Sequence, residues 1–143
     1  MTSREQVLQT TTITTTQDLR RLWASLMGAE SFGRRTLWLV ILDDDGRPSP
    51  VVMPIDDLPA APTDAEVDSF GHFFDHLVEY GTPVLLLSRS GPATVQEADR
   101  QWALALAFLT PRWPVHLAAE NAFGQCVITD LSGDPDGDRA NAS

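Results

Sequence analysis

The stretch LLLSRSGPATVQEADRQW, residues 85–102, decides the expected fold. Three leucines precede a short polar segment, and the residues after that segment repeat at helical spacing, so the stretch predicts a buried strand, a loop and a helix. Loops at the carboxyl end of a strand often carry the chemistry of α/β proteins. The first question is therefore whether this loop holds a catalytic centre or the remains of one.

Two further helices are expected upstream of this stretch. Thr16 is the expected N-cap of the first helix, which Gly28 ends. The segments TDAE (63–66) and TVQE (94–97) match the capping-box pattern, in which a Thr is followed three residues later by a Glu. They predict one helix from residue 63 that closes at Gly81, and the helix of the opening stretch from residue 94.

The strands form two groups around these helices. Residues 35–42, RTLWLVIL, are apolar on both faces, which is typical of an internal strand covered by helices on each side. DDDG at 43–46 is a hairpin signal, and Pro54 predicts that the returning strand lies at a sheet edge. This returning strand is expected at 51–55, and three more at 83–87, 113–118 and 125–131. The order of elements predicts a layered single α/β domain, a mixed sheet flanked by helices.

This domain is expected to span residues 17–131. Residues 1–16 are polar and rich in threonine, which is typical of a flexible terminus or an added edge strand. Residues 132–143 are acidic and contain several glycines, so they are expected to be disordered.

Composition excludes some classes of function. The net charge of −10 opposes binding to a nucleic-acid backbone, which needs a basic surface. No apolar run is long enough to cross a bilayer, and the N-terminus lacks a signal-peptide layout. Cys126 is the only cysteine, so no internal disulfide can form and a reducing cytoplasm is expected. We therefore expect a cytoplasmic protein that binds neither nucleic acid nor membranes.

A metal site can be drawn on the second helix. His72 and His76 are four residues apart and could share a zinc ion, with Asp99 as a third ligand. The apolar residues of this helix define the opposite face, so both histidines are expected in solvent. A solvated face is a poor place for a catalytic metal, and no metal or other cofactor is expected there.

A serine-based site can be drawn as well. It combines Ser88 or Ser90 with His116 and Asp99 as a nucleophile, a base and an orienting acid. Neither serine has the surroundings of a nucleophile elbow, and His116 lies among apolar strand residues, as core histidines do. No catalytic residue is expected on these grounds, and this set remains the alternative.

Several segments occur in the order of one known family. They are RTLWLVILDDDGRP, VVMPI, the helix that begins at Thr63, VLLLSRSGPATVQEADRQW and PVHL. Together they make residues 35–131 similar to the JAB/MPN metalloprotease-like fold, specifically its bacterial RadC-like branch. The resemblance implies JAB/MPN-like layering, and cytidine-deaminase-like layering is the other arrangement considered.

The resemblance also implies that the catalytic motif is lost. Active members of the family carry His-x-His-Pro, then a spacer, Ser, two residues and Asp, and an earlier Glu acts on the zinc-bound water. Ser88 and Ser90 stand where the histidines would be, Asp99 matches the final Asp, and Pro54 stands near the place of the Glu. Two hydroxyls and one carboxylate are a poor zinc site. Ser88, Arg89, Ser90 and Asp99 would then form a degenerate pocket.

The function expected from these observations is protein–protein interaction or regulation by a non-catalytic domain. The partner is another protein or a second copy, and a homodimer is plausible. The first helix has an apolar stripe, which either packs on its own sheet or forms an interaction surface; it comprises Leu19, Leu22, Trp23 and Leu26. The alternative is a hydrolase that uses an unrecognised metal site or serine chemistry near residues 88–99.

Overall fold

The computed structural model describes residues 12–27, 35–49, 52–56, 58–110 and 112–131. The first eleven residues, the helix end expected at Gly28 and the acidic segment 132–143 lie outside the described residues. The elements in chain order are α2 (Thr16–Met27), β1 (Thr36–Leu42), β2 (Met53–Ile55), α3 (Asp64–Leu77), β3 (Thr82–Pro92), α4 (Glu97–Leu109), β4 (His116–Glu120) and β5 (Cys126–Asp130).

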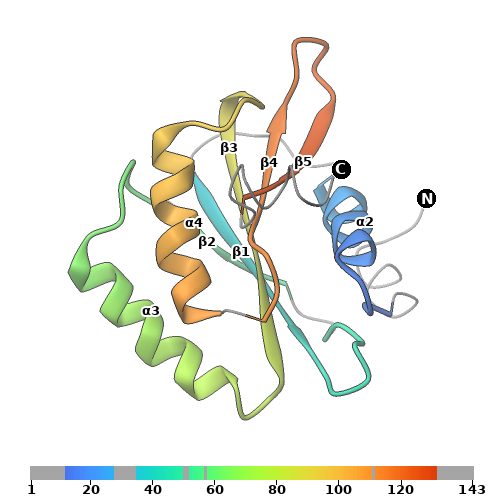
Figure 1. Cartoon of the computed structure of the whole chain (residues 1–143), viewed down its shortest axis with the longest axis vertical. Coiled ribbons are helices and arrows are strands. Elements are labelled where there is room, and N and C mark those ends of the chain that lie inside the picture. Colours follow the sequence, from blue (N-terminus) through green and yellow to red (C-terminus); the bar gives the residue numbers. More distant parts are fainter. Residues whose placement is uncertain (1–11, 28–34, 50–51, 57, 111, 132–143) are drawn as a thin grey trace, which may run out of the picture.

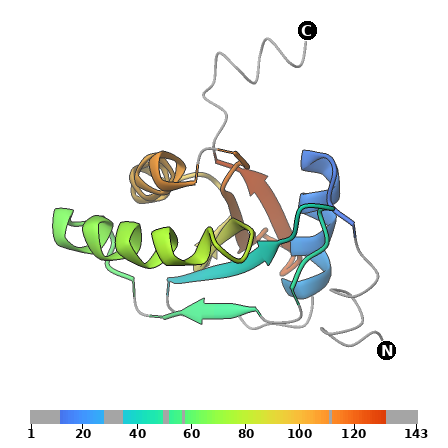
Figure 2. The same cartoon turned by 90° about the horizontal axis from the view of Figure 1, so that it is seen from below.

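These elements form three layers. A five-stranded sheet of order β2-β1-β3-β4-β5 lies between α2 on one face and α3 with α4 on the other (Figures 1 and 2). β3 and β4 run parallel, and the other neighbouring strands run antiparallel. The predicted α/β class, the mixed sheet and the order of the elements are confirmed.

β1 lies inside the sheet because its sequence is apolar on both faces. Leu37 and Leu39 point toward α3 and α4, whereas Val40 and Leu42 point toward α2. Pro54 lies in the three-residue edge strand β2, where its missing N–H does not interrupt the sheet. Both predictions from this part of the sequence are confirmed.

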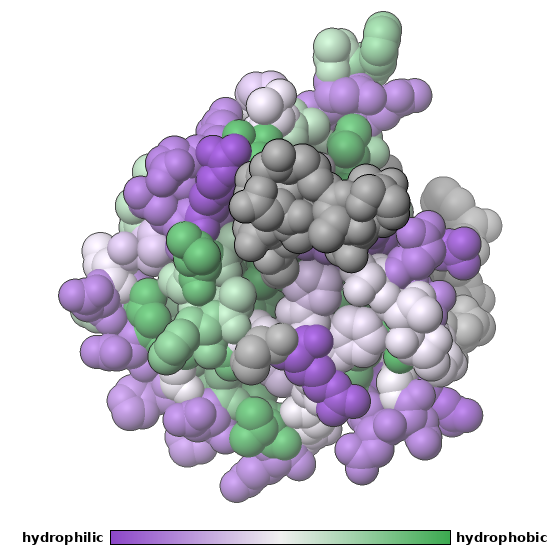
Figure 3. Space-filling view, in the orientation of Figure 1, coloured by the Kyte–Doolittle hydropathy of each residue, from purple (hydrophilic) through white to green (hydrophobic). Residues whose placement is uncertain are grey.

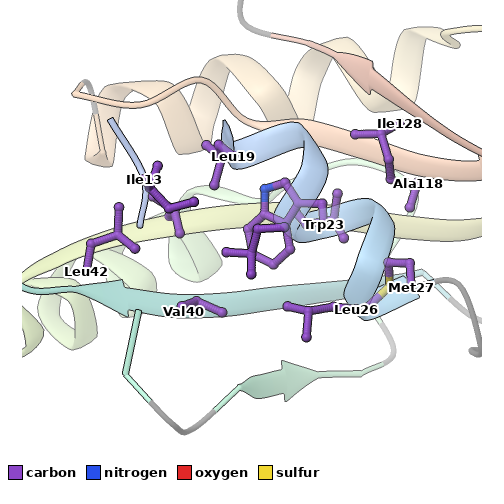
Figure 4. Packing of buried hydrophobic residues seen from close by; sticks show 12 residues of the cluster. Ile13, Leu19, Trp23, Leu26, Met27, Val40, Leu42, Ala118 and Ile128 are labelled. Atoms are coloured by element: carbon purple, nitrogen blue, oxygen red, sulfur yellow. The ribbon is translucent and has the colours of Figure 1, made fainter. Parts of the chain in front are cut away.

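Helix α2 packs on the sheet of its own chain. Trp23 points from α2 toward the strands, among Leu19, Val40 and Ala118 (Figure 4). The four side chains expected as an interaction surface are 0–5% exposed: Leu19, Leu22, Trp23 and Leu26. The apolar stripe of α2 is therefore part of the intramolecular core, and these side chains are not available to a partner at the surface.

Helices α3 and α4 cover the other face. Phe74 of α3 and Trp102 and Leu106 of α4 pack on the strands, and the Trp102 Nε1 donates a hydrogen bond to the carbonyl of Pro59 at 2.9 Å. The capping box of α3 forms as predicted, with Thr63 and Glu66 each bonding the backbone N–H of the other. No helix among the described residues has the length and apolar character needed to span a bilayer.

The caps of the other two helices differ from the prediction. The Thr15 hydroxyl, not that of Thr16, accepts the Asp18 backbone N–H at 3.1 Å, so Thr15 is the N-cap of α2. α4 begins at Glu97, three residues after the expected cap Thr94. Its N-cap is Gln96, whose backbone N–H donates to the Asp99 carboxylate at 2.8 Å.

The strand before α4 is longer than predicted. β3 continues through the polar segment to Pro92 instead of ending at Leu87, so most of the expected loop is strand. Its pairing with β4 changes register between Ser88, which pairs with Ala118, and Pro92, which pairs with Glu120. β3 therefore advances four residues where β4 advances two. Gly91 has a φ of 98° in this bulge, a conformation that glycine adopts without strain.

Candidate functional site

The bulge of β3 turns Arg89 inward, beneath the start of α4. Arg89 is 4% exposed, although Gly91, two residues later, is exposed. Arg89 Nε donates to Asp99 Oδ1 at 2.9 Å, and Nη2 donates to Asp99 Oδ2 at 2.7 Å. This is the two-pronged geometry in which a guanidinium binds a carboxylate most strongly.

The remaining donors of Arg89 bind the backbone at the end of β3 and in the β3–α4 connection. Nη1 donates to the carbonyls of Pro92 at 2.7 Å and Ser90 at 3.3 Å, and Nη2 donates to the carbonyl of Thr94 at 3.0 Å. A guanidinium has five N–H groups, and these bonds reach five acceptors. The Arg89 side chain therefore fixes the path of the segment from β3 to α4 and has no donor left for a ligand.

Asp99 is the acidic partner in this cluster and is 1% exposed. Burial favours the neutral acid and pushes its pKa up, but hydrogen bonds from Arg89 and Gln96, with the charges of Arg89 and Arg35, outweigh burial and lower the pKa. The carboxylate is therefore ionised at neutral pH. It also stabilises the positive end of the α4 dipole.

The serine-based set is divided between the two faces of the sheet. Ser88 pairs with Ala118 and His116 pairs with Leu86, so both side chains point toward α2. Asp99 lies on α4, at the opposite face, in its bonds to Arg89. The Ser88 hydroxyl accepts the Trp38 Nε1–H at 2.8 Å, and Ser90 is exposed. The structure does not bring these residues together as a nucleophile, base and acid.

His116 is a second buried ionisable group, on the α2 face. It is 0% exposed, and neither of its ring nitrogens has a hydrogen-bond partner. Burial lowers its pKa to about 4; Asp130 opposes this effect and Arg20 adds to it. The Nε1 of Trp23 is also buried without a partner. His116 is thus a neutral core imidazole at pH 7.

The structure does not bring the three candidate metal ligands together either. His72 and His76 are exposed on α3, as the helical spacing predicts, whereas Asp99 is buried on α4 and bonded to Arg89. Among the described residues, no group of three or more His, Cys, Asp or Glu side chains has an arrangement that could hold a metal ion.

The hairpin after β1 and the lone cysteine have structural explanations. Asp43 Oδ1 accepts the backbone N–H groups of Asp45 and Arg47, both at 2.9 Å, and Gly46 has a φ of 83°. These contacts describe a tight turn, as predicted. Cys126 lies at the start of β5 and is half-buried; burial, and then the carboxylate of Glu120, raise the pKa of its thiol.

A shallow hollow of about 550 Å³ lies beside the Arg89–Asp99 cluster, between the end of β3 and the β4–β5 hairpin. Among the described residues that line it, only Glu120 is charged; the others are Gly91, Pro92, Ala93, Thr94, Asn121 and Ala122. A second hollow of about 300 Å³ lies where α3 and α4 end, with Val78, Pro83 and Leu109 among its lining residues. The described lining residues of neither hollow form a convergent set of acid, base and nucleophile.

The sequence reasoning missed the exposed apolar side chains of the α3–α4 layer. Six large apolar side chains among the described residues are exposed, and five belong to α3, its C-terminal turn and α4: Phe73, Val78, Tyr80, Leu104 and Phe108. The sixth, Phe123, lies at the tip of the β4–β5 hairpin. Figure 3 shows apolar side chains gathered over α4 with hydrophilic residues around them. The sequence contains a signal for this exposed surface, because α4 has apolar residues on all sides.

The fold and this site define a small three-layer α/β domain in which the strand-to-helix connection is held by a buried ion pair. Comparisons of the chain with protein-family models, with curated proteins and with solved structures found no match.

Proposed function

We propose that this chain is a non-catalytic domain that acts by binding another protein. The observation that carries the proposal is the saturated Arg89–Asp99 cluster. Asp99 is the only acidic side chain buried in the described residues, and a permanently charged guanidinium already occupies both of its oxygens. Zinc would have to displace that guanidinium and, within the described part of the chain, would find no imidazole or thiolate grouped with Asp99.

We also propose that the domain is a degenerate relative of the JAB/MPN fold in its RadC-like branch. A mixed sheet with helices on both faces, and a strand, connection and helix over residues 85–102, support this relationship. Ser88 and Ser90 occupy the positions at which that family has histidines. In this proposal the Arg89 guanidinium supplies the positive charge that the metal supplies in active members.

The exposed apolar surface of α3 and α4 supports the protein-binding part of the proposal. Apolar side chains grouped on one surface commonly mark an interaction site. Five of the six exposed large apolar side chains in the described residues lie in this layer, whereas the stripe of α2 is buried. The net charge of −10 and the single cysteine support a cytoplasmic protein partner rather than nucleic acid.

Metal analysis tests the non-catalytic part. The full chain, purified without a histidine tag from zinc-supplemented medium, is expected to contain no stoichiometric zinc by mass spectrometry. One tightly held zinc per chain in the wild type would overturn this part without any variant. Loss of that zinc in Asp99→Ala would then support the hydrolase alternative.

Cross-linking in cells tests the protein-binding part. A photo-reactive residue at position 101 of α4 is expected to cross-link to one defined protein, identified by mass spectrometry, and Phe108→Ser is expected to abolish the adduct. Phe123→Ser is the matched control, because Phe123 is 86% exposed and Phe108 is 85% exposed. No adduct from position 101, or an adduct indifferent to Phe108→Ser, would contradict the proposal.

A further inference from the structure

We draw no further inference here: the strongest candidate, the exposed apolar face of α4 around Leu104 and Phe108, carries none because nothing in the structure shows what covers it.

Discussion

The two faces of the sheet bury ionisable side chains in opposite ways. Toward α3 and α4, Arg89 and Asp99 are charged and their polar atoms are hydrogen-bonded. Toward α2, His116 is equally buried, but its ring nitrogens have no partner and its pKa falls to about 4. The difference shows that this small domain keeps a charge inside when partners surround it, and keeps a group neutral when they do not.

Breaking the Arg89–Asp99 ion pair is expected to have the largest effect on stability. Arg89→Met leaves the buried Asp99 carboxylate without its counter-charge and removes three bonds to the backbone at the end of β3 and in the connection to α4. Loss of one partner of a buried ion pair costs about 3–5 kcal/mol of the free energy of unfolding. Urea denaturation followed by circular dichroism measures the loss.

A double variant distinguishes the unpaired charge from lost packing. Arg89→Met/Asp99→Leu removes both charges, so it is expected to be more stable than Arg89→Met alone, although the backbone bonds of Arg89 are still missing. If the double variant is less stable than the single variant, the uncompensated carboxylate is not the main cause of the loss.

His116, on the face toward α2, is expected to make the stability of the chain depend on pH. The pKa of His116 is lowered from 6.5 to about 4 in the folded chain, so the unfolded chain binds more protons between these values. Stability therefore falls as pH decreases from 6.5 toward 4, by up to about 3 kcal/mol in total. Urea denaturation in small pH steps across this range measures the loss.

The contributions of His116 and Asp99 to stability should be separable, because they are lost over different pH ranges. His116→Leu removes the imidazole at similar volume and is expected to flatten the slope between pH 6.5 and about 4. The pKa of Asp99 is lowered below 3.8, so its contribution is present at higher pH and is lost as pH falls through its folded pKa. An unchanged slope in His116→Leu over the imidazole range would assign the acid sensitivity to other groups.

The N-cap of α2 provides a smaller test of the α2 side. The Thr15 hydroxyl accepts the Asp18 N–H, and the Asp18 carboxylate accepts the N–H groups of Thr14 and Thr15. Thr15→Ala is expected to lower the free energy of unfolding by about 1 kcal/mol. Thr16→Ala is the control, since Thr16 is the cap that sequence alone predicts, and a larger loss in this control would contradict the observed cap.

Patterns within a few residues were sufficient to predict most of the fold. The apolar run of β1, Pro54 in the edge strand and the capping box at Thr63 all depend on neighbouring residues, and each is observed. The start of α4 depends on a side chain from another element. The segment TVQEAD contains two possible pairs of N-cap and N3 residues for α4, Thr94 with Glu97 and Gln96 with Asp99. The contact between Arg89 and Asp99, which are ten residues apart, selects the second pair.

The same long-range contact determines which residues of α4 are buried. Helical periodicity alone favours an inner face that contains Val95, Ala98, Trp102, Ala105 and Leu109. In the structure Asp99 turns inward to reach Arg89, so the buried face is instead Asp99, Trp102, Ala103 and Leu106. Leu104 and Phe108 lie away from this buried face and are exposed. A buried aspartate cannot be inferred from hydropathy, because hydropathy places every charge in solvent.

The smallest expected effect concerns the histidines of α3, which lie outside both buried layers. His72 and His76 are exposed and belong to no cluster of metal-ligating side chains in the described part of the chain. His72→Ala/His76→Ala is therefore expected to change the free energy of unfolding by less than about 0.5 kcal/mol. Added zinc is expected to leave the unfolding midpoint of both proteins unchanged, because a ligand stabilises a protein only when it binds the folded form. A zinc-dependent rise in the wild type that the double variant lacks would show that solvent-exposed imidazoles of α3 bind the metal. A functional surface would then lie outside the two buried layers.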